Sequence, residues 1–127
     1  MIASDIMTRN VYTTSPEVSV QEVAQLLVQK NISGVPVSNS GGQIIGIVTE
    51  ADIIGKVSRE GLCVADIMTP ELIFVDEETE VGDIAMLLVE HKIKRVPVMR
   101  DGALVGIVCR GDIVNAVAQG HVIIRHW

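Results

Sequence analysis

An internal repeat constrains this sequence more than any other feature. When the chain is aligned with itself at an offset of about 61 residues, three motifs recur in the same order. The pairs are Asp5-Ile6-Met7-Thr8 with Asp66-Ile67-Met68-Thr69, Val35-Pro36-Val37 with Val96-Pro97-Val98, and, after a one-residue deletion, Gly46-Ile47-Val48 with Gly106-Ile107-Val108. Two copies therefore fill the chain, a first repeat of residues 1–61 and a second repeat of residues 62–127 that ends in a short tail. Because about sixty residues bury too little surface for comfortable stability, we expect the two repeats to share one intertwined core.

Hydrophobic periodicity predicts the same order of elements in each repeat. Apolar residues at i, i+3, i+4 and i+7 predict an early helix, and they are Val20, Val23, Ala24 and Leu27 in the first repeat and Val81, Ile84, Ala85 and Leu88 in the second. Two β-branched runs joined by a Gly-containing turn predict a β-hairpin, at 34–38 and 43–49 in the first repeat. A final helix follows, over 50–59 or 110–119. With a short strand before the early helix, each repeat reads β-α-β-β-α, which predicts a mixed α/β fold of the α+β type.

Composition and charge limit the functions that are open to the chain. Ten Lys and Arg residues stand against 16 Asp and Glu residues, so the net charge is −6, and the basic face that nucleic-acid binding requires is not expected. The apolar runs are far shorter than the roughly 20 residues of a membrane span. The N-terminus shows no signal-peptide pattern, and two cysteines are too few for a disulfide framework. We therefore expect a cytoplasmic protein with neither nucleic acid nor membrane as a partner.

The recurring motifs resemble those of a known family, the tandem pair of cystathionine beta-synthase (CBS) domains. The resemblance covers essentially the whole chain and rests on the Asp-Ile-Met-Thr and Val-Pro-Val pairs and on two longer segments, 46–52 and 106–112. It implies a pseudo-twofold CBS pair, often a homodimer, whose inter-repeat clefts bind adenosine compounds such as AMP, ADP, ATP or S-adenosylmethionine. It also implies regulation without catalysis. We expect no cofactor, and no metal, because no Cys or carboxylate set accompanies His121 and His126. Since the chain leaves no room for an effector domain, we expect its signal to pass to an unidentified effector protein.

The resemblance also assigns candidate residues to two clefts. A nucleoside needs an apolar slot for its base and a carboxylate acceptor for its ribose, and a phosphate needs cations or amides. The main cleft would use Thr13, Lys94, Arg95, Val96, Pro97, Cys109 and Asp112, and a second cleft would use Ser33, Gly34, Val35, Pro36, Thr49, Asp52, Phe74 and Val75. Asp112 and Asp52 match the ribose-binding aspartates of the family.

A difference in charge favours the second repeat as the main site. Lys94 and Arg95 precede its Val-Pro-Val motif, where the first repeat has uncharged residues. One cationic cluster suits a monophosphate, so AMP is favoured over ATP or S-adenosylmethionine. The competing interpretation of these two charges is a solvated strand edge. Phe74 stands where the other repeat has Thr13, and it either stacks on a base or blocks the second cleft.

Helix capping is the competing explanation for both aspartates. Thr49 and Asp52 have the spacing of a capping box, which arises for helix stability alone. In the second repeat Cys109 replaces the hydroxyl, and a thiol is a poor cap, so capping is expected to explain Asp112 less well and a ligand role is favoured. The same replacement removes a donor for phosphate and argues against polyphosphates.

The sequence thus predicts a stand-alone regulatory module for energy sensing, which binds an adenine nucleotide and signals to a partner. The alternative is a ligand-free dimerisation or scaffold module whose clefts are vestigial. A third hypothesis, enzyme activity, is rejected because the sequence shows no acid–base pair, metal set or P-loop.

Overall fold

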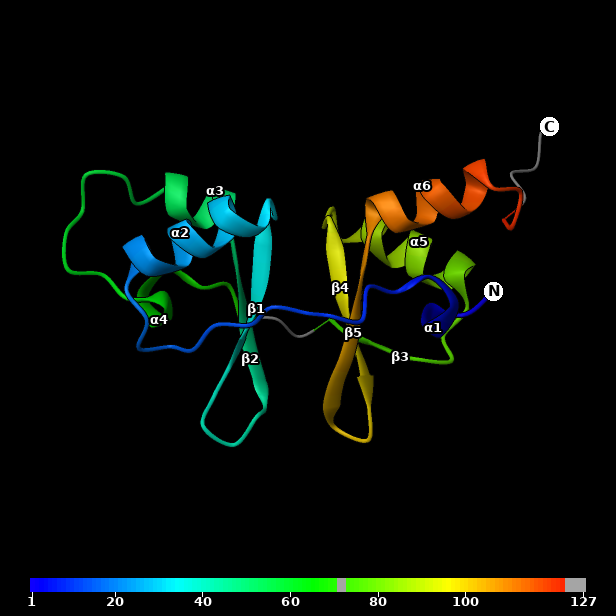
Figure 1. Ribbon diagram of the computed structural model, residues 1–127, viewed down its shortest axis with the longest axis horizontal. Coiled ribbons are helices and arrows are strands. Elements are labelled where there is room, and N and C mark those ends of the chain that lie inside the picture. Colours follow the sequence, from blue (N-terminus) through cyan, green and yellow to red (C-terminus); the bar gives the residue numbers. More distant parts are fainter. Residues whose placement is uncertain (71–72, 123–127) are drawn as a thin grey trace. The chain divides into compact units, whose positions relative to one another are not determined.

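The computed structural model describes residues 1–70 and 73–122, and these residues form two compact units (Figure 1). The continuous unit consists of residues 12–70. The discontinuous unit combines residues 1–11 with residues 73–122. Each unit therefore holds the opening segment of one repeat and the remainder of the other. The tail from residue 123 lies outside the described residues.

In the continuous unit, helices pack beside a two-stranded antiparallel sheet. Its elements are α2 (Val20–Lys30), β1 (Gly34–Ser38), β2 (Ile44–Thr49), α3 (Glu50–Ile54) and α4 (Val64–Ile67). Ser19 caps α2 by accepting a 3.1 Å hydrogen bond from the amide of Glu22, and Asn31 ends the helix in a left-handed conformation. The buried core consists of Val23, Leu27, Val35, Val37, Val48, Val64 and Ile67.

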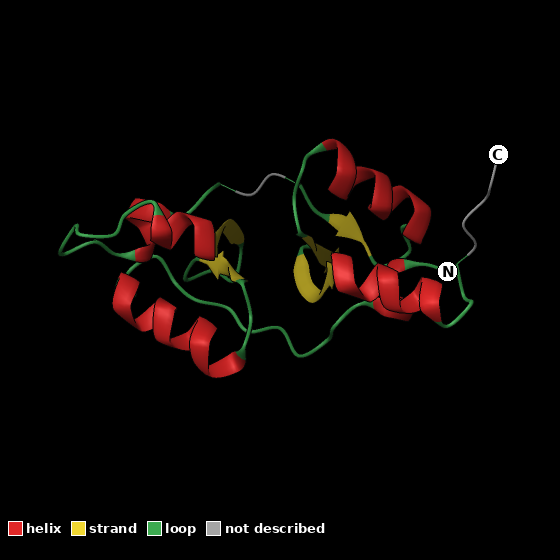
Figure 2. Ribbon diagram, turned by 90° about the horizontal axis from the view of Figure 1, so that it is seen from above, coloured by secondary structure: helices red, strands yellow, loops and turns green. Residues whose placement is uncertain are grey.

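The discontinuous unit repeats this arrangement with a third strand. Its elements are α1 (Ala3–Ile6), β3 (Val75–Asp76), α5 (Val81–Glu90), β4 (Arg95–Arg100), β5 (Ala103–Cys109) and α6 (Arg110–Ala118). β4 pairs antiparallel with β5 and parallel with β3. Figure 2 shows that, in each unit, the longer helices lie to the same side of the strands. The core contains Ala3, Met7, Val75, Ile84, Leu88, Val96, Val98 and Val108.

The short helices α1 and α4 attach the exchanged opening segments. In the discontinuous unit the amide of Ala3 donates a 2.8 Å hydrogen bond to the carbonyl of Thr79, and in the continuous unit Val64 donates a 2.8 Å bond to Val18. Ala3 and Val64 are both fully buried. None of the helices in the two described ranges is long and apolar enough to cross a membrane.

A glycine in the last strand of each unit allows the opening segment to approach. Thr8 and Ile107 exchange two backbone hydrogen bonds of 2.9 and 3.0 Å, beside Gly106. A Cβ atom on Gly106 would collide with the side chain of Met7 and lie 3.0 Å from the carbonyl oxygen of Thr8. The same arrangement recurs in the continuous unit at Thr69, Ile47, Gly46 and Met68. The recurring Met and Gly positions therefore form one packing contact.

The predicted mixed α/β architecture is confirmed, with four differences in the elements. α3 ends at Ile54 instead of residue 59, because Gly55 disfavours helix and Ser58 turns the chain with a φ of 77°. The first strand of the first repeat is reduced to a single bridge between Thr14 and Val37. Sequence patterns did not predict α1 or α4, because each has only four residues and follows an N-cap that lacks a capping side chain.

Candidate functional site

The candidate residues of the second repeat converge where the β4–β5 hairpin meets α6. Cys109 ends β5, is the N-cap of α6 and pairs in register with Arg95 at the start of β4. The amide of Arg110 donates a 3.0 Å hydrogen bond to the carbonyl of Lys94. Asp112 lies in the first turn of α6. The hairpin register thus brings together four residues that are separated by up to 18 positions in the sequence.

Asp112 caps α6 although Cys109 carries no hydroxyl. Its Oδ2 accepts a 2.7 Å hydrogen bond from the backbone amide of Cys109. The same bond, donated by the N-cap amide to the carboxylate of the third helical residue, recurs at Asp5 (2.8 Å), Asp52 (2.9 Å) and Asp66 (2.8 Å). Asp112 therefore has a capping role as well, through the backbone amide alone, whereas the Thr49 hydroxyl adds two further bonds with Asp52.

The second carboxylate oxygen distinguishes the two aspartates. Oδ1 of Asp52 accepts a 3.1 Å hydrogen bond from the hydroxyl of Thr69. Among the described residues, Oδ1 of Asp112 accepts no hydrogen bond, and the equivalent threonine, Thr8, makes no such contact with it. Asp112 therefore retains an acceptor for a ligand after it has capped its helix.

Arg95 and Cys109 form a half-buried polar cluster with Asp112. Arg95 is only 6% exposed, and its side chain hydrogen bonds to the thiol of Cys109. Burial and then the charge of Asp112 raise the pKa of the Cys109 thiol, although Arg95 opposes both effects. The thiol is therefore protonated at neutral pH. The solvated-edge interpretation is wrong for Arg95, whose charge is buried, whereas Lys94 is exposed.

The corresponding junction of the first repeat is uncharged on the strand side. Thr49 ends β2 and pairs with Gly34, and the amide of Glu50 donates a 3.0 Å bond to the carbonyl of Ser33. Oδ2 of Asp52 accepts bonds from both the amide (2.9 Å) and the hydroxyl (3.1 Å) of Thr49. The reciprocal bond from the amide of Asp52 to the Thr49 hydroxyl, at 3.4 Å, completes the capping box. In this junction, the Thr49 hydroxyl and Oδ2 of Asp52 therefore hydrogen bond to each other and to nearby backbone amides.

The other candidate residues divide between buried strands and the opposite unit. The side chains of Val35, Pro36, Val96 and Pro97 are buried in the strands, so they offer mainly backbone to a ligand. Thr13 is exposed and belongs to the continuous unit, while exposed Phe74 and buried Val75 belong to the discontinuous unit. Completion of each cleft by these three residues stays a prediction.

Sequence patterns did not reveal a polar pocket that also includes Asp112. The pocket has a volume of about 240 Å³ and is lined by Met1, Asp5, Ile6, Asp112, Asn115, Ala116, Gln119 and His121. The spacing of Asp112, Asn115 and Gln119 along one helix face would have indicated such a surface. Within the described residues, no group of three or more His, Cys, Asp or Glu side chains is arranged to hold a metal ion.

Comparison with protein families gives two matches to one model. The CBS domain model matches residues 3–59 and again residues 64–119. Together the two segments cover most of the chain and follow the two repeats.

Two sequence relatives illustrate the similarity. The CBS domain-containing protein YhcV of Bacillus subtilis is 34% identical over 120 residues, which cover 91% of this chain and 85% of YhcV. The CBS domain-containing protein CBSX2 of Arabidopsis thaliana is 31% identical over 149 residues, which cover 91% of this chain. The matched region spans only 63% of the length of CBSX2.

Solved structures with the same fold contain adenosine compounds. The crystal structure of CBSX2 in complex with AMP has a TM-score of 0.86 and 33% identity, covering 95% of this chain and 98% of that one. The CBS domain pair of protein MJ0100, in complex with 5′-methylthioadenosine and S-adenosyl-L-methionine, has a TM-score of 0.88 and 28% identity. That similarity covers 94% of this chain and 98% of the MJ0100 chain.

Proposed function

Because the chain belongs to the CBS domain family, we propose that it is a regulatory module that binds an adenosine-containing ligand and relays the bound state to a partner protein. The observation that carries this proposal is Oδ1 of Asp112, which accepts no hydrogen bond from the described residues and lies near the buried Arg95, since Asp112 and Arg95 both contact Cys109. A carboxylate that accepts from ribose hydroxyls and a cation that binds phosphate are the groups a nucleotide requires. The adenosine compounds in the structures of CBSX2 and MJ0100 support the same ligand class.

The preferred ligand in this proposal is a monophosphate such as AMP. Lys94 and Arg95 supply two positive charges at the start of β4, and Cys109 replaces a hydroxyl donor at the helix terminus. ATP places more negative charge in the site than these residues neutralise. Thr13 remains a candidate ligand-binding residue in this proposal.

We assign a lesser role to the cleft of the first repeat. Both oxygens of Asp52 already accept hydrogen bonds within the continuous unit, and no cation occupies the position equivalent to Arg95. In this proposal the second cleft, for which Phe74 and Val75 remain candidate residues, holds an uncharged nucleoside moiety or no ligand.

The proposed module is regulatory, not catalytic, and acts in the cytoplasm as a homodimer that signals to an effector protein. Its role would be to report the level of an adenine nucleotide, as an energy sensor does. A scaffold without a ligand is the second candidate function. It is favoured by Asp52, because both of its carboxylate oxygens already accept hydrogen bonds within the protein.

Thermal unfolding with a panel of ligands tests the proposal. Purified protein is heated alone and with adenosine, AMP, ADP, ATP or S-adenosylmethionine. A ligand at a hundred times its dissociation constant stabilises the fold by about 2.7 kcal/mol, which raises Tm by several degrees. We expect AMP to give the largest shift and adenosine a smaller one.

Lys94→Ala separates the phosphate contribution from the rest of the site. In this variant, the rise in Tm caused by AMP should come closer to the rise caused by adenosine. Lys30→Ala, which also removes one exposed lysine charge, should leave the difference between the two Tm shifts unchanged. If no ligand raises Tm and mass spectrometry of the denatured protein finds no nucleotide already bound, the scaffold function replaces the sensor.

A further inference from the structure

The aspartates at the first junction, where β2 meets α3, and at the second junction, where β5 meets α6, carry different numbers of hydrogen bonds. Asp52 accepts three: from the amide (2.9 Å) and the hydroxyl (3.1 Å) of Thr49, both at Oδ2, and from the hydroxyl of Thr69 (3.1 Å) at Oδ1. Asp112 accepts one from the described residues, a 2.7 Å bond from the amide of Cys109 at Oδ2. A single side chain, that of Thr69, therefore occupies the oxygen that corresponds to the unbonded oxygen of Asp112.

The backbone holds Thr69 in place for this bond. Thr69 and Ile47 exchange two backbone hydrogen bonds of 2.8 and 2.9 Å, which attach the end of the opening segment to β2. Because a β-branched side chain has few χ1 rotamers, its hydroxyl has few directions once the backbone is fixed. The bond to Asp52 joins residues that are 17 positions apart, and both belong to the continuous unit. The contact is therefore formed entirely within that unit.

The second repeat has a threonine at the same position without the same contact. Thr8 exchanges backbone hydrogen bonds of 2.9 and 3.0 Å with Ile107, as Thr69 does with its own strand. Among the described residues, however, the Thr8 hydroxyl makes no hydrogen bond with Asp112. The threonine is thus common to both repeats, but it occupies the aspartate only in the first.

We propose that Thr69 determines which junction of this chain binds a nucleoside, because its hydroxyl occupies an acceptor site that the ribose requires at the first junction. An ionised carboxylate has about four lone-pair sites, and two neighbouring ribose hydroxyls need two of them. Asp52 has three in use and so retains about one, whereas Asp112 retains about three. Without the bond from Thr69, Asp52 would have the two sites that a ribose needs. This inference rests on the proposed function and adds the residue that selects between the two repeats.

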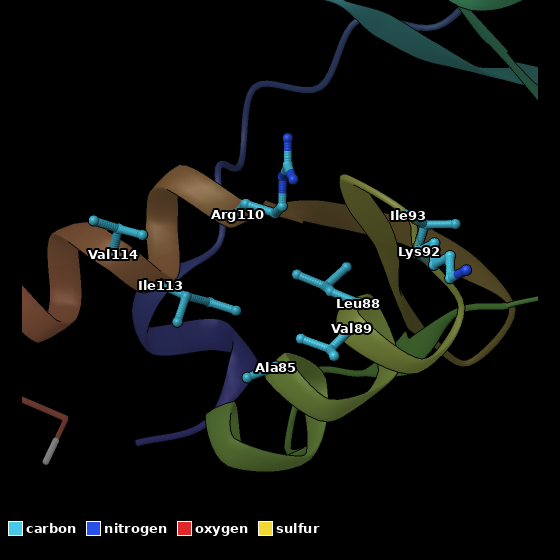
Figure 3. A pocket seen from close by; sticks show the side chains of 8 residues that line it. All are labelled: Ala85, Leu88, Val89, Lys92, Ile93, Arg110, Ile113 and Val114. Atoms are coloured by element: carbon cyan, nitrogen blue, oxygen red, sulfur yellow. The ribbon is translucent and has the colours of Figure 1, made fainter. Parts of the chain in front are cut away.

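The probe for the first junction has to be uncharged. Glu50 begins α3 where Arg110 begins α6, and Figure 3 shows the Arg110 side chain extending away from the apolar side chains between α5 and α6. Gly34 pairs with the end of β2 where Arg95 pairs with the end of β5. These charges favour an anionic phosphate at the second junction and disfavour it at the first. Adenosine, which has the ribose hydroxyls but no phosphate, is therefore the probe.

Isothermal titration calorimetry with adenosine tests the proposal in a chain whose second junction is weakened by Asp112→Asn. That chain is compared with the same chain carrying Thr69→Val in addition, so that the change in affinity reports on the first junction. Thr69→Val removes the hydroxyl and keeps the branched shape of the side chain. We expect the dissociation constant of adenosine to fall about 3- to 10-fold, which is the effect of one exposed hydrogen bond. An unchanged dissociation constant overturns the proposal.

Matched controls separate a contact with the ribose from a general change in the protein. 2′,3′-Dideoxyadenosine has no hydroxyl to donate to Asp52, so Thr69→Val should leave its affinity unchanged. Thr69→Ser keeps the hydroxyl and should bind adenosine as weakly as the Asp112→Asn chain alone. Thr8→Val removes the equivalent hydroxyl, which does not contact Asp112, and should have no effect. An equal gain for the dideoxy compound or from Thr8→Val would overturn the proposal.

The proposed function and the role of Thr69 fail in different measurements. If the wild type binds neither AMP nor adenosine, the proposed nucleotide site of the second repeat is wrong. The role of Thr69 is tested by the gain in the Asp112→Asn chain, and addition of Asp52→Asn should remove that gain. A gain that survives Asp52→Asn overturns the role of Thr69. Circular dichroism melting verifies that each variant is folded, and Thr69→Ala removes the hydroxyl in a second way if the valine variant does not fold.

Discussion

The two strand-to-helix junctions, at Thr49 and at Cys109, have the same backbone geometry but use their polar groups differently. In the first, the hydroxyls of Thr49 and Thr69 occupy both oxygens of Asp52. In the second, one carboxylate oxygen of Asp112 caps the helix by accepting from the amide of Cys109, and its other oxygen accepts no hydrogen bond from the described residues. A duplicated fold can therefore keep one junction for stability and leave its copy chemically available.

The strand side of each junction reinforces this difference. Gly34 pairs with Thr49, whereas Arg95 pairs with Cys109 and remains 6% exposed. A charge buried to this extent is costly unless other groups compensate it, and the thiol of Cys109 is one contact that it makes. The strand side of the junction is therefore charged in the second repeat and uncharged in the first.

Substituting the two aspartates tests the comparison most strongly. Asp112→Asn removes the charge that the ribose would bind but keeps an oxygen for the helix cap, so AMP affinity should fall roughly 10- to 100-fold. Asp52→Asn should change AMP affinity by less than about twofold. Isothermal titration calorimetry gives both values, and an equal loss in the two variants would show that the junctions are functionally equivalent.

The next largest effect is a loss of stability when the glycines beside the opening segments are replaced by alanine. A Cβ atom at position 106 would collide with the buried Met7 side chain and lie 3.0 Å from the carbonyl oxygen of Thr8, so Gly106→Ala should cost about 1–3 kcal/mol. Gly46→Ala should cost a similar amount, because its Cβ atom would lie 2.9 Å from both the Met68 sulfur and the carbonyl oxygen of Thr69. Urea unfolding at equilibrium measures both, and an unchanged stability in either variant would contradict the packing argument.

Substituting the N-cap residue of each repeat with the type found in the other should change the stability of the protein less, and with opposite sign in the two repeats. Thr49→Cys removes the hydroxyl that accepts from the Asp52 amide and should destabilise the protein by about 1 kcal/mol. Cys109→Ser adds a hydroxyl where α6 has no side-chain cap and should stabilise it by up to about 1 kcal/mol. Thermal unfolding of both variants is the measurement, and two changes of the same sign would refute this account.

The smallest effect concerns the ionisation of Cys109. Because burial and Asp112 raise its pKa above the usual 9.0, its contribution to stability is complete below that pH and is lost as the pH rises through the pKa of the folded protein. Asp112→Asn should lower this pKa and speed alkylation of Cys109 by iodoacetamide in mildly alkaline buffer. Mass spectrometry locates the modified cysteine, and an unchanged rate would mean that Asp112 does not act on the thiol.

Sequence patterns predicted the elements that have strong local signals. The apolar spacing in α2 and α5 and the β-branched runs of the hairpins gave the architecture, because periodic burial determines these elements. The patterns failed at α1 and α4, where a single aspartate three residues after an apolar N-cap is the only local signal. They also missed the contact between Arg95 and Cys109, which depends on strand register and burial.

The exchanged opening segments determine where this chain can be cut. A gene fragment for residues 1–61 encodes a whole repeat, but it lacks α4, which covers part of the core of the continuous unit, and it retains α1 without the sheet on which α1 packs. A fragment that begins at residue 12 and extends through residue 70 carries every element of the continuous unit in one stretch. Boundaries for fusion or permutation of this protein therefore follow its packing and not its duplicated sequence.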